Sequence, residues 1–217
     1  MALVMLLLYE ILVVLGGSSS GMVVRNAPEA WMRNVLHFVG VPHYTISFAF
    51  MTGALIALPV FYRSGVRFSR GIVFGMLLES VFWGLFTGFA IRFFTVGLPL
   101  FSGGFSGSIP ANLGLAIGAG LFEELLFRVL LTTFLLKTFK RLFRSALPSV
   151  VLSVLIASFL FSLAHYVGNM ADDFTLYSFA FRFFAGIWFT TLYAVRGFAI
   201  TCLSHAFYDI FVLILSP

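Results

Sequence analysis

Seven long apolar runs dominate this chain and limit the folds that it can adopt. They cover residues 2–16, 44–62, 71–96, 111–137, 148–168, 174–195 and 197–216. About 20 mainly apolar residues in a helix cross a hydrocarbon core of about 30 Å. The first run is short, so a half-span or an interfacial helix is an alternative there. The runs predict an all-α fold, a polytopic membrane helix bundle of about seven transmembrane or membrane-embedded helices.

The composition favours the same class. Of the 217 residues, 61% are hydrophobic and 10% are charged, whereas soluble domains have about 45–50% apolar and about 25% charged residues. The single cysteine, Cys202, excludes an intramolecular disulfide and a zinc site built from cysteines. No linker is long enough to separate two domains. Residues 1–217 are therefore expected to form a single integral membrane domain.

The basic residues between the runs predict an orientation. Alternate loops at 63–70, 137–147 and 196 hold eight of the 13 Lys and Arg residues, and the positive-inside rule places such loops in the cytoplasm. The net charge of +5 is thus attributed to membrane orientation, with the lipid bilayer as partner and no nucleic acid. The short loops favour a small prokaryotic protein of the cell membrane.

Ionisable residues inside three of the runs are the main functional signal. A charge near the middle of a spanning helix costs about 2.5–3.5 kcal/mol, so such residues face the protein interior and are candidates for function. They are Glu123, Glu124, Arg128, His165, His205 and Asp209. At about 1.5 Å per residue, Glu123, His165 and Asp209 each lie about 20–25 Å from the cytoplasmic end of their run. Three helices are therefore predicted to bring polar groups to one depth.

The spacing within the runs indicates which groups interact. Glu124 and Arg128 are four residues apart, as are His205 and Asp209, so each pair shares one helix face. Glu123 is turned by about 100° from Glu124 and faces another neighbour. Polar clamps between helices are the structural alternative, but a clamp does not require so many groups that exchange protons.

Two kinds of chemistry suit this set of residues. A glutamate in an apolar site can accept a proton from water, while a histidine holds the water or relays the proton. Alternatively, two histidines and one or two carboxylates could bind zinc with a water molecule. A different class, a membrane carrier with an acid and histidine proton relay, uses similar residues, but the chain shows no paired repeats of the kind that carriers have.

The three motifs in order resemble those of the CPBP family. They are EExxxR (Glu123, Glu124, Arg128), FxxxH (Phe161, His165) and HxxxD (His205, Asp209), all within 111–216. That family comprises the type II CAAX prenyl endopeptidases, including the Ras-converting enzyme, and the bacteriocin-processing or Abi proteins. The resemblance implies an intramembrane endopeptidase, and an inactive scaffold member of the family is an alternative.

The resemblance also implies a role for each residue. Glu123 with His165 would activate water, a Glu124–Arg128 pair would orient the site, and the third motif would stabilise the oxyanion. That motif ends in Asn in the Ras-converting enzymes, so Asp209 is a departure. It is expected to be protonated, to orient His205, or to bind a metal.

The cofactor and the substrate are left open. No cofactor is favoured, and a divalent metal such as zinc is the alternative. The expected partner is a peptide or protein substrate, either prenylated or a leader peptide, because nothing in the chain distinguishes a prenyl pocket from a peptide groove.

Other polar positions are given structural interpretations. Gly104–Gly107 matches a GxSG serine-protease motif around Ser106, but a flexible turn explains it better. Glu79 is expected to pair with Arg92 or Arg182. Glu10 is expected at the membrane interface, and residues 27–44 along the membrane surface.

Overall fold

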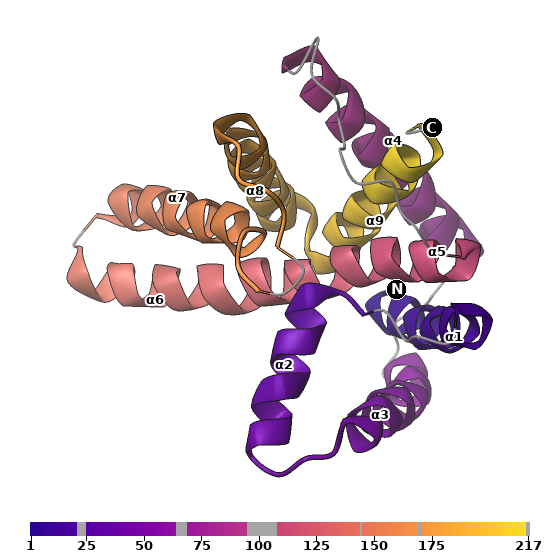
Figure 1. The fold of residues 1–217 in the computed structure, drawn as a ribbon. Helices are drawn as coiled ribbons and strands as arrows, with labels where there is room; N and C mark the ends of the chain where they lie inside the picture. The colour runs from indigo at the N-terminus through magenta and orange to yellow at the C-terminus, as the bar shows by residue number, and fades with distance from the viewer. Residues whose placement is uncertain (21–24, 64–68, 95–107, 144, 169–170, 216–217) are drawn as a thin grey trace. The chain divides into compact units, whose positions relative to one another are not determined.

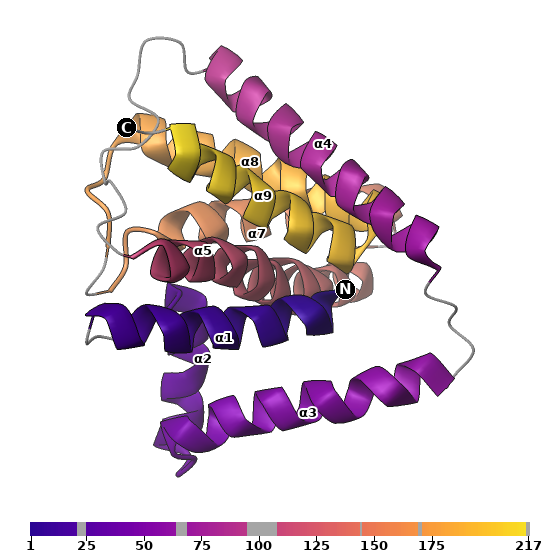
Figure 2. The ribbon, with the colours of Figure 1, turned by 90° about the vertical axis from the view of Figure 1, so that its right-hand side faces the viewer.

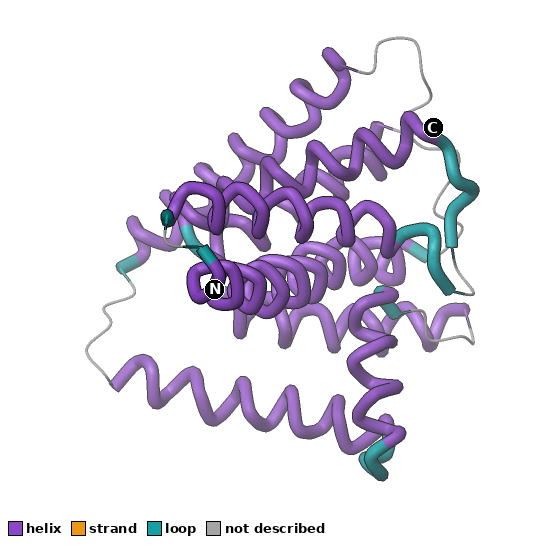
Figure 3. The backbone as a smooth tube through the Cα atoms, turned by 90° about the vertical axis from the view of Figure 1, so that its left-hand side faces the viewer, coloured by secondary structure: helices purple, strands orange, loops and turns teal. Residues whose placement is uncertain are grey.

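The computed structural model describes residues 1–20, 25–63, 69–94, 108–143, 145–168 and 171–215. Across these ranges the regular elements are helices and none is a strand (Figure 3). The expected all-α class is confirmed. The GxSG stretch around Ser106 and most of the predicted cytoplasmic loop at 63–70 lie outside the described residues.

The helices follow the apolar runs (Figure 1). In chain order they are α1 (Ala2–Ser20), α2 (Ala27–Phe38), α3 (His43–Arg63), α4 (Arg70–Phe94), α5 (Ile109–Gly118), η1 (Ala119–Thr132), α6 (Thr133–Leu142), α7 (Ala146–Ala164), α8 (Leu176–Arg196) and α9 (Phe198–Leu215). The short helix α2 occupies the stretch expected along the membrane surface, and that location stays a prediction.

Several helices are long and apolar enough to cross a membrane. In the described residues these are Arg70–Ala90, Ala146–Ala164 and Leu176–Arg196, and the apolar helices Ala2–Gly17 and Phe198–Val212 are shorter. The chain is thus consistent with the helical membrane bundle expected from its sequence.

The exposed surface of α4 shows why lipid suits this chain. Phe74, Phe82 and Phe89 are exposed, whereas Ser80 and Thr87 are buried. Both hydroxyls donate to backbone carbonyl groups one turn earlier in the same helix. Apolar side chains outside and satisfied polar groups inside are the pattern that a hydrocarbon solvent favours.

The fourth apolar run differs from the single α-helix expected for residues 111–137. It begins as α5 and ends as α6, but its middle, η1, is a π-helix. The Thr132 hydroxyl donates to the Phe127 carbonyl oxygen five residues earlier, at 2.7 Å. π-Helical turns are rare and often lie at functional sites. An apolar pattern does not separate the two helix types, because both satisfy their backbone groups within the helix.

The chain divides into two compact units, which are described separately. The first comprises Met1–Phe122 and Cys202–Pro217, and the second comprises Glu123–Thr201. The expectation of a single domain stays a prediction.

In the first unit, α1 lies along α5 (Figure 2). A Cβ atom at Gly16 would lie 2.8 Å from Ala111 Cα, and one at Gly118 would lie 2.6 Å from Cε2 of Tyr9. Glycine therefore permits this close approach of two helices, as is common in membranes.

In the second unit, α7 packs against both α6 and α8. Gly186 of α8 lies against Ser158 of α7, where an added Cβ would come within 2.9 Å of the serine Cβ. The Ser162 hydroxyl donates to the Phe179 carbonyl oxygen at 2.7 Å. Small residues and an interhelical hydrogen bond thus hold α7 to α8. Helix α7 ends at Ala164, immediately before His165 of the FxxxH motif.

Candidate active site

The predicted pair between Glu124 and Arg128 is present in η1. Arg128 Nε lies 3.1 Å from Glu124 Oε2, and both side chains are fully buried, at 1% and 0% exposure. Removing two charges from water costs several kcal/mol per ion, so only close pairing and further contacts make such burial tolerable. The pair is a fixed part of the second unit.

Two phenylalanine rings provide further contacts to Arg128. Its guanidinium carbon lies 4.3 Å from the ring centroid of Phe161 on α7 and 5.7 Å from that of Phe189 on α8. Both rings are buried. A cation over an aromatic face gains about 0.5–1 kcal/mol when exposed and about 2 kcal/mol or more when desolvated. Phe161 belongs to the FxxxH motif, whereas sequence reasoning did not identify Phe189.

His165 follows the last residue of α7, and its ring has a defined orientation. Nδ1 lies 2.9 Å from the Phe161 carbonyl oxygen, and the imidazole contacts the Phe161 ring edge to face at 5.1 Å between centroids. A carbonyl oxygen only accepts, so Nδ1 carries the proton. In the neutral imidazole, Nε2 then holds the lone pair. This nitrogen is the one available to accept a hydrogen bond from water.

Glu123 is one of three residues whose charge acts on His165, together with Arg182 and Asp172. Its side chain is almost fully buried, and its carboxylate interacts electrostatically with the imidazole. Both residues belong to the second unit. The structure thus places the carboxylate and the imidazole in the same unit, and their partnership in the reaction stays a prediction.

The third motif lies on α9, in the first unit. His205 Nε2 is 3.7 Å from Asp209 Oδ2, with side-chain exposures of 7% and 17%. The distance exceeds that of a hydrogen bond, but it allows an ion pair when the imidazole is protonated. The pairing predicted from the four-residue spacing is present, and the role of Asp209 stays open.

A metal site would require several donor side chains close together. Within the part of the chain that the structure describes, no three His, Cys, Asp or Glu side chains are grouped closely enough to hold a metal ion. The predicted roles of the six site residues, with or without metal, stay predictions.

The loop after His165 is attached to α8 by Arg182. The Arg182 guanidinium pairs with Asp172 and donates to the Tyr166 hydroxyl at 2.9 Å. The Asp172 backbone N–H donates to the His165 carbonyl oxygen at 2.9 Å. Glu79 accepts from Trp83 Nε1 at 3.2 Å, and its expected pairing with Arg92 or Arg182 stays a prediction. The Arg92 side chain lies outside the described residues.

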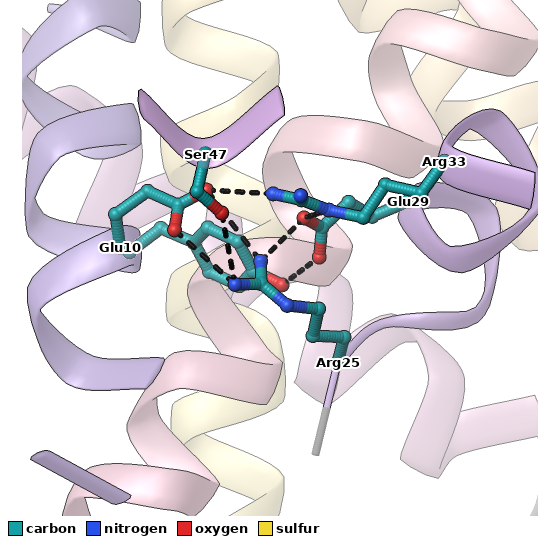
Figure 4. Close-up of polar contacts among 6 residues, drawn as sticks. Glu10, Arg25, Glu29, Arg33 and Ser47 are labelled. Atoms are coloured by element: carbon teal, nitrogen blue, oxygen red, sulfur yellow. Dashed lines mark hydrogen bonds and ion pairs between the residues drawn. The ribbon is translucent and has the colours of Figure 1, made fainter. Parts of the chain in front are cut away.

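A second buried cluster was missed by sequence reasoning. Four ion pairs join Arg25, and Arg33 of α2, each to both Glu10 of α1 and Glu29 of α2 (Figure 4). We refer to Glu10, Arg25, Glu29 and Arg33 as the N-terminal ionic cluster. Glu10 is 1% exposed and therefore buried within the protein, and its expected place at the membrane interface stays a prediction. Arg25, Glu29 and Arg33 are spaced four residues apart, a signal that the sequence did contain.

The charges of this cluster support one another. Burial lowers the pKa of Arg25, but the carboxylates of Glu29 and Glu10 outweigh that effect and its pKa is raised overall. Arg33 Nη2 lies 2.9 Å from Glu10 Oε1, and Arg33 Nε also contacts Glu29. The two arginines and the two glutamates of the cluster therefore neutralise one another's charge.

The fold and these side chains define a helical membrane protein with paired carboxylates, an arginine and histidines buried in its helices. The family model described as type II CAAX prenyl endopeptidase Rce1-like matches residues 104–211. Residues 104–211 therefore carry a domain of the Rce1-like family, consistent with the CPBP family that the three motifs predicted. The match includes all six predicted site residues. No curated protein and no solved structure matches the chain.

Proposed function

We propose that this protein is an intramembrane endopeptidase that hydrolyses a peptide bond with a water molecule activated by Glu123 and His165. The observation that carries the proposal is the interaction of the buried Glu123 carboxylate with the His165 imidazole, in a chain that carries a domain of the Rce1-like family. A carboxylate removes a proton from water as the water oxygen attacks the substrate carbonyl. His165 Nε2, the lone-pair nitrogen, accepts a hydrogen bond from that water.

The pair of Glu124 and Arg128 supports Glu123 without taking part in proton transfer. Glu124 is paired with Arg128 in a fully buried site, and Arg128 rests against Phe161. These contacts hold η1, the helix that also carries Glu123. A site held in this way needs little reorganisation during the reaction.

His205 and Asp209 are proposed to stabilise the negative oxygen of the tetrahedral intermediate. A protonated imidazole donates to an oxyanion, and Asp209 lies 3.7 Å from His205 Nε2. A neutral Asp209 could itself donate, as an aspartic acid does when an apolar site keeps it protonated. A metal-dependent reaction through His165, His205 and Asp209 is the alternative mechanism.

The substrate is proposed to be a peptide or protein that reaches the site within the membrane, either prenylated or a leader peptide. We propose that the protein lies in a prokaryotic cell membrane, with loops 63–70, 137–147 and 196 in the cytoplasm because of their Lys and Arg residues.

The test compares cleavage of a quenched-peptide library, with and without prenylated members, by detergent-purified wild type and Glu123→Gln. Glu79→Gln is the matched control, since Glu79 lies on α4 outside the motifs. We expect Glu123→Gln to lose cleavage by a factor of about 10²–10⁴, while Glu79→Gln and added chelator leave it unchanged. Full activity of Glu123→Gln would rule out the mechanism.

The same experiment separates the alternatives. Cleavage that is lost with chelator assigns the histidines and Asp209 to a metal. Absence of cleavage in the wild type, together with proton-coupled uptake by proteoliposomes, would favour a carrier, and absence of both would favour an inactive scaffold.

A further inference from the structure

The N-terminal ionic cluster lies outside residues 104–211, the region that matches the family. Burying four charged side chains is costly unless each is paired, and pairing alone does not explain why the chain places them here. Their contacts lead towards the helix that carries the glutamates.

The first step is the fixed position of Tyr9. Its hydroxyl donates to the Glu29 carboxylate, which is itself held by Arg25 at 2.6 Å and by Arg33. Tyr9 is fully buried. The cluster therefore fixes both the position and the rotation of the Tyr9 ring.

The second step is the contact between Tyr9 and η1. The Tyr9 ring meets the Phe122 ring edge to face, with 5.2 Å between centroids. Gly118 leaves the space for this ring, because a Cβ there would lie 2.6 Å from it. Phe50 of α3 contacts Phe122 from a second direction at 6.3 Å, and Arg33 of the cluster lies over the Phe50 ring at 5.7 Å. Two rings that contact the cluster thus hold Phe122.

The third step is covalent. Phe122 and Glu123 are consecutive residues of η1, so restraint of the Phe122 backbone also restrains the point from which the Glu123 side chain extends. We propose that Tyr9, held by the N-terminal ionic cluster, is a positioning residue that fixes Glu123 through Phe122. The catalytic part of this inference rests on the proposed function, whereas the restraint of η1 does not.

Three variants of the full-length protein isolate the contact. Tyr9→Leu removes the ring and the hydroxyl, and Tyr9→Phe removes only the hydroxyl and keeps the ring against Phe122. Val14→Ala is the matched control, because Val14 lies on the same helix with 64% exposure. If Tyr9→Leu does not fold, Phe122→Leu takes its place, because this change removes the same ring contact by replacing its other partner.

The first measurement is hydrogen exchange of the backbone amides of residues 118–126 in detergent micelles. We expect Tyr9→Leu to raise the exchange rate about tenfold or more, Tyr9→Phe to raise it less, and Val14→Ala to leave it unchanged. Unchanged exchange in a folded Tyr9→Leu or Phe122→Leu protein would overturn the proposal.

The second measurement is peptide cleavage by the monodisperse fraction of each variant. A misplaced Glu123 lowers kcat by about tenfold or more and leaves KM within about twofold, and Tyr9→Phe should restore most of the loss. A change confined to KM would contradict the positioning role. Absence of cleavage by the wild type would refute the proposed function, and the exchange rates would then decide the restraint of η1 alone.

Discussion

Arg128 and Phe161 form the contact that joins the first two motifs, with the guanidinium carbon 4.3 Å from the ring centroid. The same ring meets the His165 imidazole at 5.1 Å. The phenylalanine of FxxxH therefore contacts both the arginine of EExxxR and the histidine of its own motif. The two motifs are one packed group in the second unit.

This contact predicts that an aromatic ring is required at position 161. Phe161→Leu should destabilise the protein by about 1–3 kcal/mol, through the lost cation–π contact and imperfect packing, and should lower cleavage because His165 loses its neighbour. Phe161→Tyr should retain most of both. Thermal unfolding and cleavage rates measure the two effects. Phe134→Leu on α6, where the ring is 64% exposed, is the control, and an equal loss in both leucine variants would contradict the role of Phe161.

The buried pair of Glu124 and Arg128 should show strong energetic coupling. Glu124→Gln or Arg128→Met alone leaves one buried charge without its opposite, which costs about 3–5 kcal/mol. The double variant should lose less unfolding free energy than the two single variants lose together, with a coupling energy of about 0.5–3 kcal/mol. Chemical unfolding of all four proteins measures the cycle.

The pair of Asp172 and Arg182 is the matched comparison for that cycle. The Asp172 side chain is 54% exposed, so the corresponding cycle should give only about 0–1 kcal/mol. Equal coupling in the two cycles would mean that burial does not set the strength of these pairs.

His165 offers a way to separate ring orientation from chemistry. Asn at position 165 retains an N–H near the position of Nδ1, which can still donate to the Phe161 carbonyl oxygen, but it has no counterpart of Nε2. We expect His165→Asn to keep a melting temperature close to that of the wild type and to lose cleavage by a factor of about 10²–10⁴. An active His165→Asn protein would remove the imidazole from the proposed reaction.

Asp209 departs from the asparagine of the Ras-converting enzymes, and substitution tests what it supplies. If the site needs a hydrogen-bond donor, Asp209→Asn should retain cleavage within about tenfold, and Asp209→Leu should lose a factor of about 10²–10³. Cleavage rates of both variants measure this. Equal losses would show that the negative charge, acting on His205, is what matters.

The helices were predictable because hydrocarbon imposes length and polarity on them. The ends of α7, α8 and α9 follow the apolar runs closely, and four-residue spacing was enough to predict the pairing of Glu124 with Arg128. These features depend on residues that are close in the sequence. Local patterns therefore predicted both the fold class and the two pairs of site residues four positions apart, Glu124 with Arg128 and His205 with Asp209.

The contacts that were missed join residues far apart in the chain. Phe189 lies on α8, and no spacing relates it to Arg128 on η1. The repeat of Arg25, Glu29 and Arg33 could have indicated a charged helix face, but Glu10 as their common partner depends on how α1 meets α2. The π-helical form of η1 has no sequence pattern of its own.

The glycine edge of α5 has a consequence for where this protein can be divided. Gly114 and Gly118 lie against Leu12 and Tyr9 of α1, so a fragment that begins at the start of the family match would keep the motifs but expose the glycine edge that α1 covers. Such a fragment would present bare backbone to lipid and to other copies of itself. The boundary of sequence similarity therefore divides two helices that pack against each other, and a fragment of this chain that preserves that packing has to include α1.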